Sequence, residues 1–112
     1  MPIFITQGRY SQQAMKGMVA NPEDRSEPTR KLFEGSGGRL IDYYVTFGEY
    51  YFLIISEAPD ERTMLGILAA AGAGGGVTDL KTVLAVSSAD AKTAFASAAK
   101  AAAQFRSAGQ TS

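Results

Sequence analysis

The stretch FGEYYFLIIS, residues 47–56, decides the fold because it joins two predicted strands through a turn signal. We expect Gly48-Glu49 to form a two-residue hairpin loop, since glycine at the first central position suits a type II′ turn. The resulting register pairs Phe47 with Tyr50, Thr46 with Tyr51, Val45 with Phe52, Tyr44 with Leu53 and Asp42 with Ile55. Because successive side chains of a strand point to opposite sides, the register also assigns the two faces of the sheet.

One face of the predicted hairpin is almost wholly apolar and is expected to lie beneath the helices. It carries Ile41, Tyr43, Val45, Phe47, Tyr50, Phe52 and Ile54. The other face mixes aliphatic side chains with hydroxyls and a carboxylate, and it carries Leu40, Asp42, Tyr44, Thr46, Tyr51, Leu53 and Ile55. If helices cover only one side of the sheet, this mixed face would be exposed as an apolar patch. We therefore expect it to be buried against a second copy of the chain.

Signals along the rest of the chain complete one α+β fold. Strands are predicted at 3–7, 39–47, 50–57 and 78–87, and helices near Ser11, Asn21-Pro22, Pro59 or Asp60, and Ser88. Pro28 is expected to interrupt the second helical segment, and Gly37-Gly38 to end it with a left-handed cap. The glycine run at 72–76 indicates a helix stop rather than a phosphate loop, because no Lys-Ser/Thr follows it. The order predicts a ferredoxin-like βαββαβ arrangement with a four-stranded antiparallel sheet and a C-terminal helix.

Apolar residues recur at helical spacing in the predicted helices. In the first helix, one face is formed by Ala14, Met15, Met18 and Val19. In the third, the residues expected to face the core are Met64, Ile67, Leu68 and Ala71. The C-terminal helix has an alanine-rich stripe with Phe95 and Phe105. We expect this stripe to pack on its own domain, and the alternative is docking on a partner through the two phenylalanines.

The length and the charge balance of the chain limit the kinds of partner that it is expected to have. A chain of 112 residues is expected to form a single domain over 1–106, with a flexible tail over 107–112. Basic and acidic residues both number 11, so no basic excess exists to hold phosphates, and no nucleic-acid partner is expected. The start MPIFITQG does not resemble a secretion signal, and MLGILAAAGAGGGV is too short to span a bilayer. We expect a cytoplasmic protein without a membrane partner.

Two residue types are missing from the sequence. It contains no cysteine and no histidine, which excludes a thiolate nucleophile, a disulfide framework and a histidine-containing triad. A metal site would need carboxylates alone, and the sequence contains no suitable acidic cluster. The catalytic residues are therefore unknown, and we expect neither a metal nor a cofactor.

A longer segment around the hairpin resembles a known family. The residues RKLFEGSGG at 30–38, followed by RLIDYYVTFGEYYFLIISEAPDE at 39–61, closely resemble the GYD domain, a group within the dimeric α/β-barrel superfamily. The similarity extends from residue 2 to about residue 87. Gly48 and Tyr50 match the Gly-x-Tyr-Asp signature, whereas Tyr51 occupies the position of its Asp. The segment APDE at 58–61 matches the usual exit from the strand.

The resemblance implies a ferredoxin-like protomer whose sheet packs face to face on a second copy, as in a dimeric α/β barrel. It implies no settled activity. Superfamily relatives include cofactor-free monooxygenases and isomerases, which often rely on histidine. Replacement of the signature Asp by Tyr51 also removes the carboxylate that would be the natural general base.

Two interpretations of the mixed face stay open. The candidate site residues Asp42, Tyr44, Thr46, Tyr51, Leu53 and Ile55 line either a small-molecule pocket or a plain dimer interface. The leading hypothesis is a homodimer that is non-enzymatic or binds a small apolar or aromatic ligand between sheet and helices. One alternative is a cofactor-independent monooxygenase-like or isomerase-like enzyme. Another is an assembly protein whose C-terminal helix builds higher oligomers.

Overall fold

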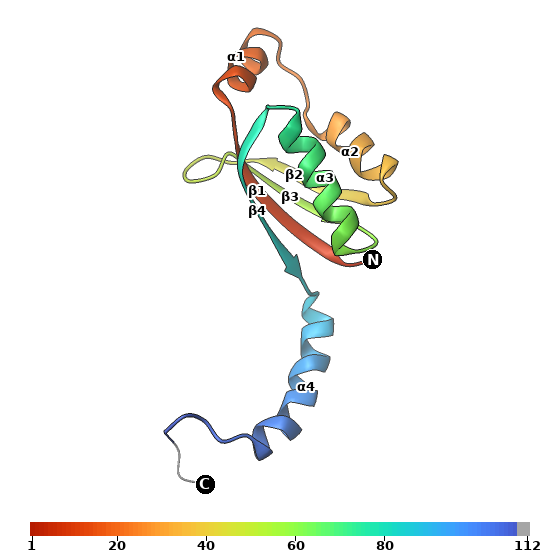
Figure 1. Cartoon of the computed structure of the whole chain (residues 1–112), viewed down its shortest axis with the longest axis vertical. Helices are drawn as coiled ribbons and strands as arrows, with labels where there is room; N and C mark the ends of the chain where they lie inside the picture. Colours follow the sequence, from red (N-terminus) through yellow and green to blue (C-terminus); the bar gives the residue numbers. More distant parts are fainter. Residues whose placement is uncertain (110–112) are drawn as a thin grey trace.

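The computed structural model describes residues 1–109 and contains one four-stranded antiparallel sheet with strand order β2-β3-β1-β4 (Figure 1). The elements are β1 Ile3–Tyr10, α1 Gln12–Ala20, α2 Ser26–Gly35, β2 Arg39–Val45, β3 Phe52–Glu57, α3 Glu61–Ala73, β4 Val77–Ala85 and α4 Ser88–Gln104. This order and topology confirm the predicted ferredoxin-like α+β fold with a C-terminal helix.

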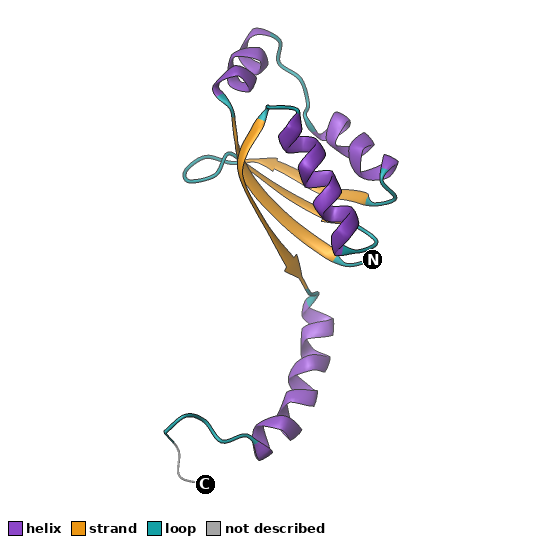
Figure 2. Ribbon diagram, in the orientation of Figure 1, coloured by secondary structure: helices purple, strands orange, loops and turns teal. Residues whose placement is uncertain are grey.

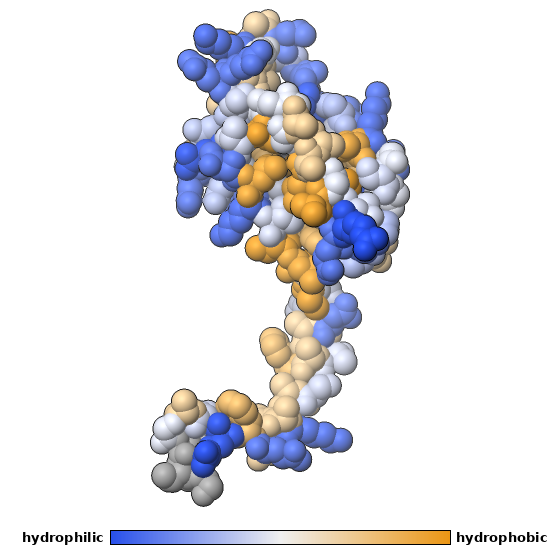
Figure 3. Space-filling model, in the orientation of Figure 1, coloured by the Kyte–Doolittle hydropathy of each residue, from blue (hydrophilic) through white to orange (hydrophobic). Residues whose placement is uncertain are grey.

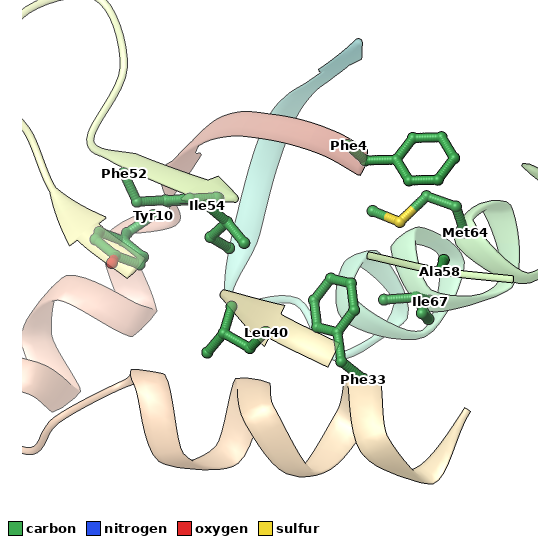
Figure 4. Close-up of a cluster of buried hydrophobic side chains, with 9 residues drawn as sticks. All are labelled: Phe4, Tyr10, Phe33, Leu40, Phe52, Ile54, Ala58, Met64 and Ile67. Carbon is green, nitrogen blue, oxygen red and sulfur yellow. The ribbon is translucent and has the colours of Figure 1, made fainter. Parts of the chain in front are cut away.

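Helices α2 and α3 cover one face of the sheet, and no helix within residues 1–109 covers the other (Figure 2). The core lies between the covered face and these two helices (Figure 4). Its buried members are Phe4, Tyr10, Phe33, Leu40, Phe52, Ile54, Ala58, Met64 and Ile67. Helix α1 lies beyond the end of the sheet and buries no side chain, although Ala14 and Met18 pack against the core.

The predicted register of the central hairpin is confirmed where the two strands pair. Asp42 lies opposite Ile55, Tyr44 opposite Leu53 and Val45 opposite Phe52. The predicted two-residue loop is wrong, because β2 ends at Val45 and β3 begins only at Phe52. The last backbone hydrogen bond across the hairpin runs from Thr46 N–H to the carbonyl of Tyr51, at 2.8 Å.

Contacts with β1 explain the wider loop. The backbone N–H of Tyr51 donates to the carbonyl of Gly8 at 2.8 Å, and Arg9 Nε donates to the carbonyl of Glu49 at 2.7 Å. These bonds hold the loop against the neighbouring strand instead of closing it as a tight turn. Gly48 adopts φ +113°, a conformation that favours glycine.

Two groups of residues lie elsewhere than the alternation predicts. The register shifts between Leu40 and Asp42, and this bulge turns Leu40 into the core, where it is 5% exposed. Leu40 was therefore wrongly assigned to the mixed face. Val45 and Phe47 were expected beneath the helices, but both are exposed, Val45 by 72% and Phe47 by 98%. Phe47 lies in the loop that projects past the sheet (Figure 1). Phe52 and Ile54 are buried as predicted.

The predicted helix caps are mostly confirmed. Ser11 and Asp60 accept hydrogen bonds from Ala14 N–H and Thr63 N–H, and Gly37 ends α2 with φ +86°. The second helix, however, does not start at Asn21-Pro22. It begins at Ser26, so that Pro28 lies in its first turn, where a missing N–H costs no hydrogen bond.

Helix α4 does not pack on its own domain, so that prediction is wrong. Within Ser88–Gln104, all of which the structure describes, no side chain is buried, and Phe95 is 73% exposed. The helix extends away from the sheet and gives the molecule a length of 64 Å (Figure 3). The N-cap is Ser87 rather than Ser88, because β4 ends earlier than predicted. The predicted division at 106 stays a prediction, and part of the predicted tail, 110–112, lies outside the described residues.

Candidate functional site

A cavity of about 550 Å³ lies between the covered face of the sheet and the helices. Its walls are mainly apolar: Phe52 and Ile54 come from β3, Leu32 from α2, and Met64 and Ile67 from α3. Asn21 and Glu23, which are exposed residues of the α1–α2 connection, also border it. Its size and lining are typical of sites for small organic molecules.

Two tyrosines form the polar end of this cavity. The hydroxyls of Tyr10, at the end of β1, and Tyr43, in β2, are 2.6 Å apart. Strand β3 lies between β1 and β2, so the two side chains meet over its residue Phe52. The ring of Phe52 lies 5.2 Å from that of Tyr10 and 6.0 Å from that of Tyr43, centroid to centroid. Figure 4 shows Tyr10 beside Phe52.

Burial further favours the neutral form of both phenols. Removal from water raises the pKa of both phenols above their ordinary value, and the hydrogen bond to Tyr10 raises the pKa of Tyr43 further. The guanidinium of Arg25 lowers both pKa values in part. Both phenols are therefore neutral at physiological pH, and neither acts as a base there.

The charges at the cavity border largely balance one another. Arg25 forms an ion pair with Glu23, with 2.7 Å between Nη1 and Oε1. Asp24 accepts hydrogen bonds from the backbone N–H and the hydroxyl of Ser26. Among residues 1–109, Arg25 is the cation that lines this cavity, and its ion pair with Glu23 partly offsets its charge.

The structure brings four of the six predicted site residues together. Asp42 pairs with Ile55 and Tyr44 with Leu53 on the uncovered face of the sheet. Neighbouring strands add Ile5, opposite Ile55, to the same face. These side chains lie on the opposite side of the sheet from the cavity.

Thr46 and Tyr51 lie apart from those four residues. They line a second hollow, of about 650 Å³, between the hairpin loop and α1. The Tyr51 ring lies 6.5 Å from that of Tyr10, and the guanidinium carbon of Arg9 lies 5.9 Å from its centroid. The Tyr10–Tyr43 pair borders both hollows. The other signature residues, Gly48 and Tyr50, belong to the loop that bounds the second one.

The sequence interpretation missed the two tyrosines that give the cavity its polar end. Tyr43 was correctly placed on the apolar face, but its hydroxyl was not assigned a partner. A buried tyrosine hydroxyl usually has a hydrogen-bond partner, and that was the available signal. Tyr10 was overlooked because the first strand was expected to end at Gln7, whereas it continues to Tyr10.

Two kinds of feature are absent from residues 1–109. No group of three or more Asp or Glu residues is arranged so that it could hold a metal ion. No helix in this part of the chain is long and apolar enough to cross a membrane.

Comparison with known proteins gives a family and a relative. The model of the GYD domain matches residues 4–95. The glutamine synthetase and cystathionine beta-lyase binding protein of Thermus thermophilus is 31% identical over 64 residues, which cover 57% of this chain and 67% of the relative.

Two solved structures share the fold. A transcriptional regulator from Neisseria meningitidis, determined as an L-Met complex, superposes with a TM-score of 0.56 at 13% identity, covering 78% of this chain and 51% of the regulator. An AsnC family transcriptional regulator from Agrobacterium tumefaciens gives a TM-score of 0.52 at 15% identity, with 77% and 50% covered. At these identities the likeness concerns the fold alone.

Proposed function

Because the chain belongs to the GYD domain family, we propose that it is a small homodimeric protein that binds a small apolar or aromatic molecule between its sheet and its helices, without a reaction. The observation that carries this proposal is the apolar cavity of about 550 Å³ under α2 and α3. The two phenols at its end are neutral, so they supply no tyrosinate base for a reaction. The L-Met complex of the Neisseria meningitidis regulator adds a precedent for ligand binding by a protein containing this fold.

The homodimer is supported by the uncovered face of the sheet. Ile5 is paired with Ile55 on one side and with Val83 on the other, so a row of aliphatic side chains crosses three strands. Tyr44 and Val83 are exposed in the single chain. Burying such a face against a second copy removes apolar surface from water, at about 25 cal/mol per Å². In this proposal Asp42, Tyr44, Leu53 and Ile55 form the dimer interface rather than the ligand pocket.

A cavity-filling substitution tests the ligand site. Ala71 of α3 lines the cavity, whereas Ala69 of the same helix is exposed and does not. Ala71→Trp should weaken binding of the neutral fluorescent probe N-phenyl-1-naphthylamine by about tenfold or more, because the indole occupies the space that the probe needs. Ala69→Trp, the matched control, should bind like the parent. Fluorescence titration measures both.

Two results of that titration would contradict the proposal. The first is a parent protein that shows no saturable binding. The second is equal affinity in Ala71→Trp and the parent, with the two circular dichroism spectra alike, which would place the probe outside the cavity.

Helix α4 supports a second candidate function, which is assembly. Phe95 on α4 and Phe105, the residue directly after the helix, are both more than two-thirds exposed, and no side chain of α4 is buried. A helix with an exposed apolar stripe is suited to packing against a partner. Assembly through α4 is compatible with a ligand-binding domain, since the two features occupy different parts of the molecule.

A further inference from the structure

One of the two hydroxyl protons of the Tyr10–Tyr43 pair takes no part in the bond between them. Each phenol carries one O–H donor, and each oxygen also accepts. The single bond between Tyr10 and Tyr43 uses one of the two protons. Among residues 1–109, neither hydroxyl has a hydrogen bond to a second protein group. The pair therefore offers one free O–H donor at the end of an apolar cavity.

Other hydroxyls that line the cavity are engaged locally. Thr29 donates to the backbone carbonyl of Arg25 at 2.8 Å. Thr6 is bonded to Thr82 within the sheet at 3.0 Å and lies on β1, four residues before Tyr10. By the same count, the threonine pair also keeps one hydroxyl proton outside that bond. Thr6 therefore provides an internal control for the tyrosine pair, because it presents a hydroxyl to the same cavity at a different position.

The electrostatics of the site disfavour an anion. The Arg25 guanidinium is already bonded to Glu23, and Asp24 adds a further negative charge beside it. A carboxylate placed in the cavity would lose its hydration, and Arg25, the cation that lines the cavity, is already paired with Glu23, so the cost of burying the charge is not offset. A neutral carbonyl oxygen costs far less to bury, and it accepts one hydrogen bond well.

The apolar walls favour a flat ring system. Phe33 and Phe52 contribute aromatic faces and edges, and Met64 contributes a thioether that adapts to irregular shapes. Resting on the proposed ligand-binding function, we propose that the cavity selects a neutral aromatic molecule with one hydrogen-bond acceptor, of the aromatic ketone class, whose oxygen accepts the spare O–H of the Tyr10–Tyr43 pair.

Three naphthalene compounds test this assignment by competition with N-phenyl-1-naphthylamine. Naphthalene has the rings alone, 2-acetonaphthone adds a neutral acceptor, and 2-naphthoate adds an anion. The full chain should bind 2-acetonaphthone about fivefold to tenfold more tightly than naphthalene, as one net hydrogen bond allows. It should bind 2-naphthoate most weakly.

The decisive variant removes both hydroxyls. A single Tyr10→Phe or Tyr43→Phe substitution frees the remaining phenol from its partner and leaves one O–H, so either should keep part of the preference. The double variant Tyr10→Phe/Tyr43→Phe keeps both rings packed and should bind 2-acetonaphthone and naphthalene equally. Thr6→Val, which removes a hydroxyl elsewhere in the cavity, should behave like the parent.

Each contrary result overturns the assignment in a distinct way. Equal affinity of the parent for naphthalene and 2-acetonaphthone means that the pair donates to no ligand, while the proposed binding function stands. Tightest binding of 2-naphthoate means that Arg25 controls recognition. A preference that survives in the double variant but disappears in Thr6→Val places the acceptor at Thr6. Failure of all three compounds and of the fluorescent probe to bind removes the proposed function itself.

Discussion

Tyr10 and Tyr43 illustrate how a site arises from residues on strands that are not adjacent. Their strands are separated by β3, and the two long side chains bridge it by lying over Phe52. The hydrogen bond between the hydroxyls satisfies one donor and one acceptor that burial would otherwise leave unpaired. The same burial raises their pKa values, so the pair has a measurable effect on stability at high pH.

Stability should fall as the pH rises above about 10, the ordinary pKa of tyrosine. Both phenols have raised pKa values in the folded chain, so in this range the unfolded chain has lost protons that the folded chain retains. The unfolded state then binds fewer protons, which makes the free energy of unfolding decrease with pH. Urea denaturation between about pH 8 and pH 11 measures the slope. The double variant Tyr10→Phe/Tyr43→Phe should show a shallower slope, and an identical slope would contradict the burial of the pair.

Among the secondary-structure elements, the central hairpin shows how far the alternation of side chains along a strand predicts which residues are buried. Alternation in β2 and β3 correctly placed Tyr43, Phe52 and Ile54, because the period of a strand depends only on backbone geometry. It failed at Leu40, where a bulge reverses the alternation, and at Phe47, where contacts with β1 hold the loop open. Both failures come from interactions between segments that are distant in sequence. The position of the cavity depends on the same kind of interaction, and so it was not predicted.

Phe52 and Phe47 provide a matched test of the hairpin. Both were assigned to the same face, yet Phe52 is 2% exposed and Phe47 is 98% exposed. Phe52→Ala should reduce the free energy of unfolding by about 3–5 kcal/mol, since it leaves a hole between two tyrosine rings. Phe47→Ala should change it by less than about 0.5 kcal/mol. Chemical denaturation of the two variants decides the point, and similar losses in both would show that the loop packs on the core.

At the scale of the whole molecule, two apolar surfaces lack a partner within residues 1–109. One is the uncovered face of the sheet, and the other is the stripe of α4. The sheet face was predicted from the hairpin alone, because a strand with apolar residues on both sides needs cover on both sides. The course of α4 could not be predicted, since an amphipathic stripe does not specify which surface it will meet.

Dimerisation should depend on the sheet face and not on α4. Light scattering at micromolar concentration should give at least twice the protomer mass of 11.8 kDa. Ile5→Asp places a charge in the middle of the aliphatic row and should produce monomers that remain folded. Phe95→Ser/Phe105→Ser should leave the dimer intact and abolish only larger assemblies. A parent that stays monomeric, or a dimer lost in the α4 variant alone, would contradict the assignment of the interface.

A crystal structure of the full chain with 2-acetonaphthone would locate the ligand directly. We expect the rings to lie between β3 and α3, with the ketone oxygen within hydrogen-bond distance of the Tyr10 or Tyr43 hydroxyl. The opposite result would be a compound bound on the uncovered face, beside Asp42 and Tyr44, and a cavity closed by its own side chains. That result would contradict the assignment of the ligand site.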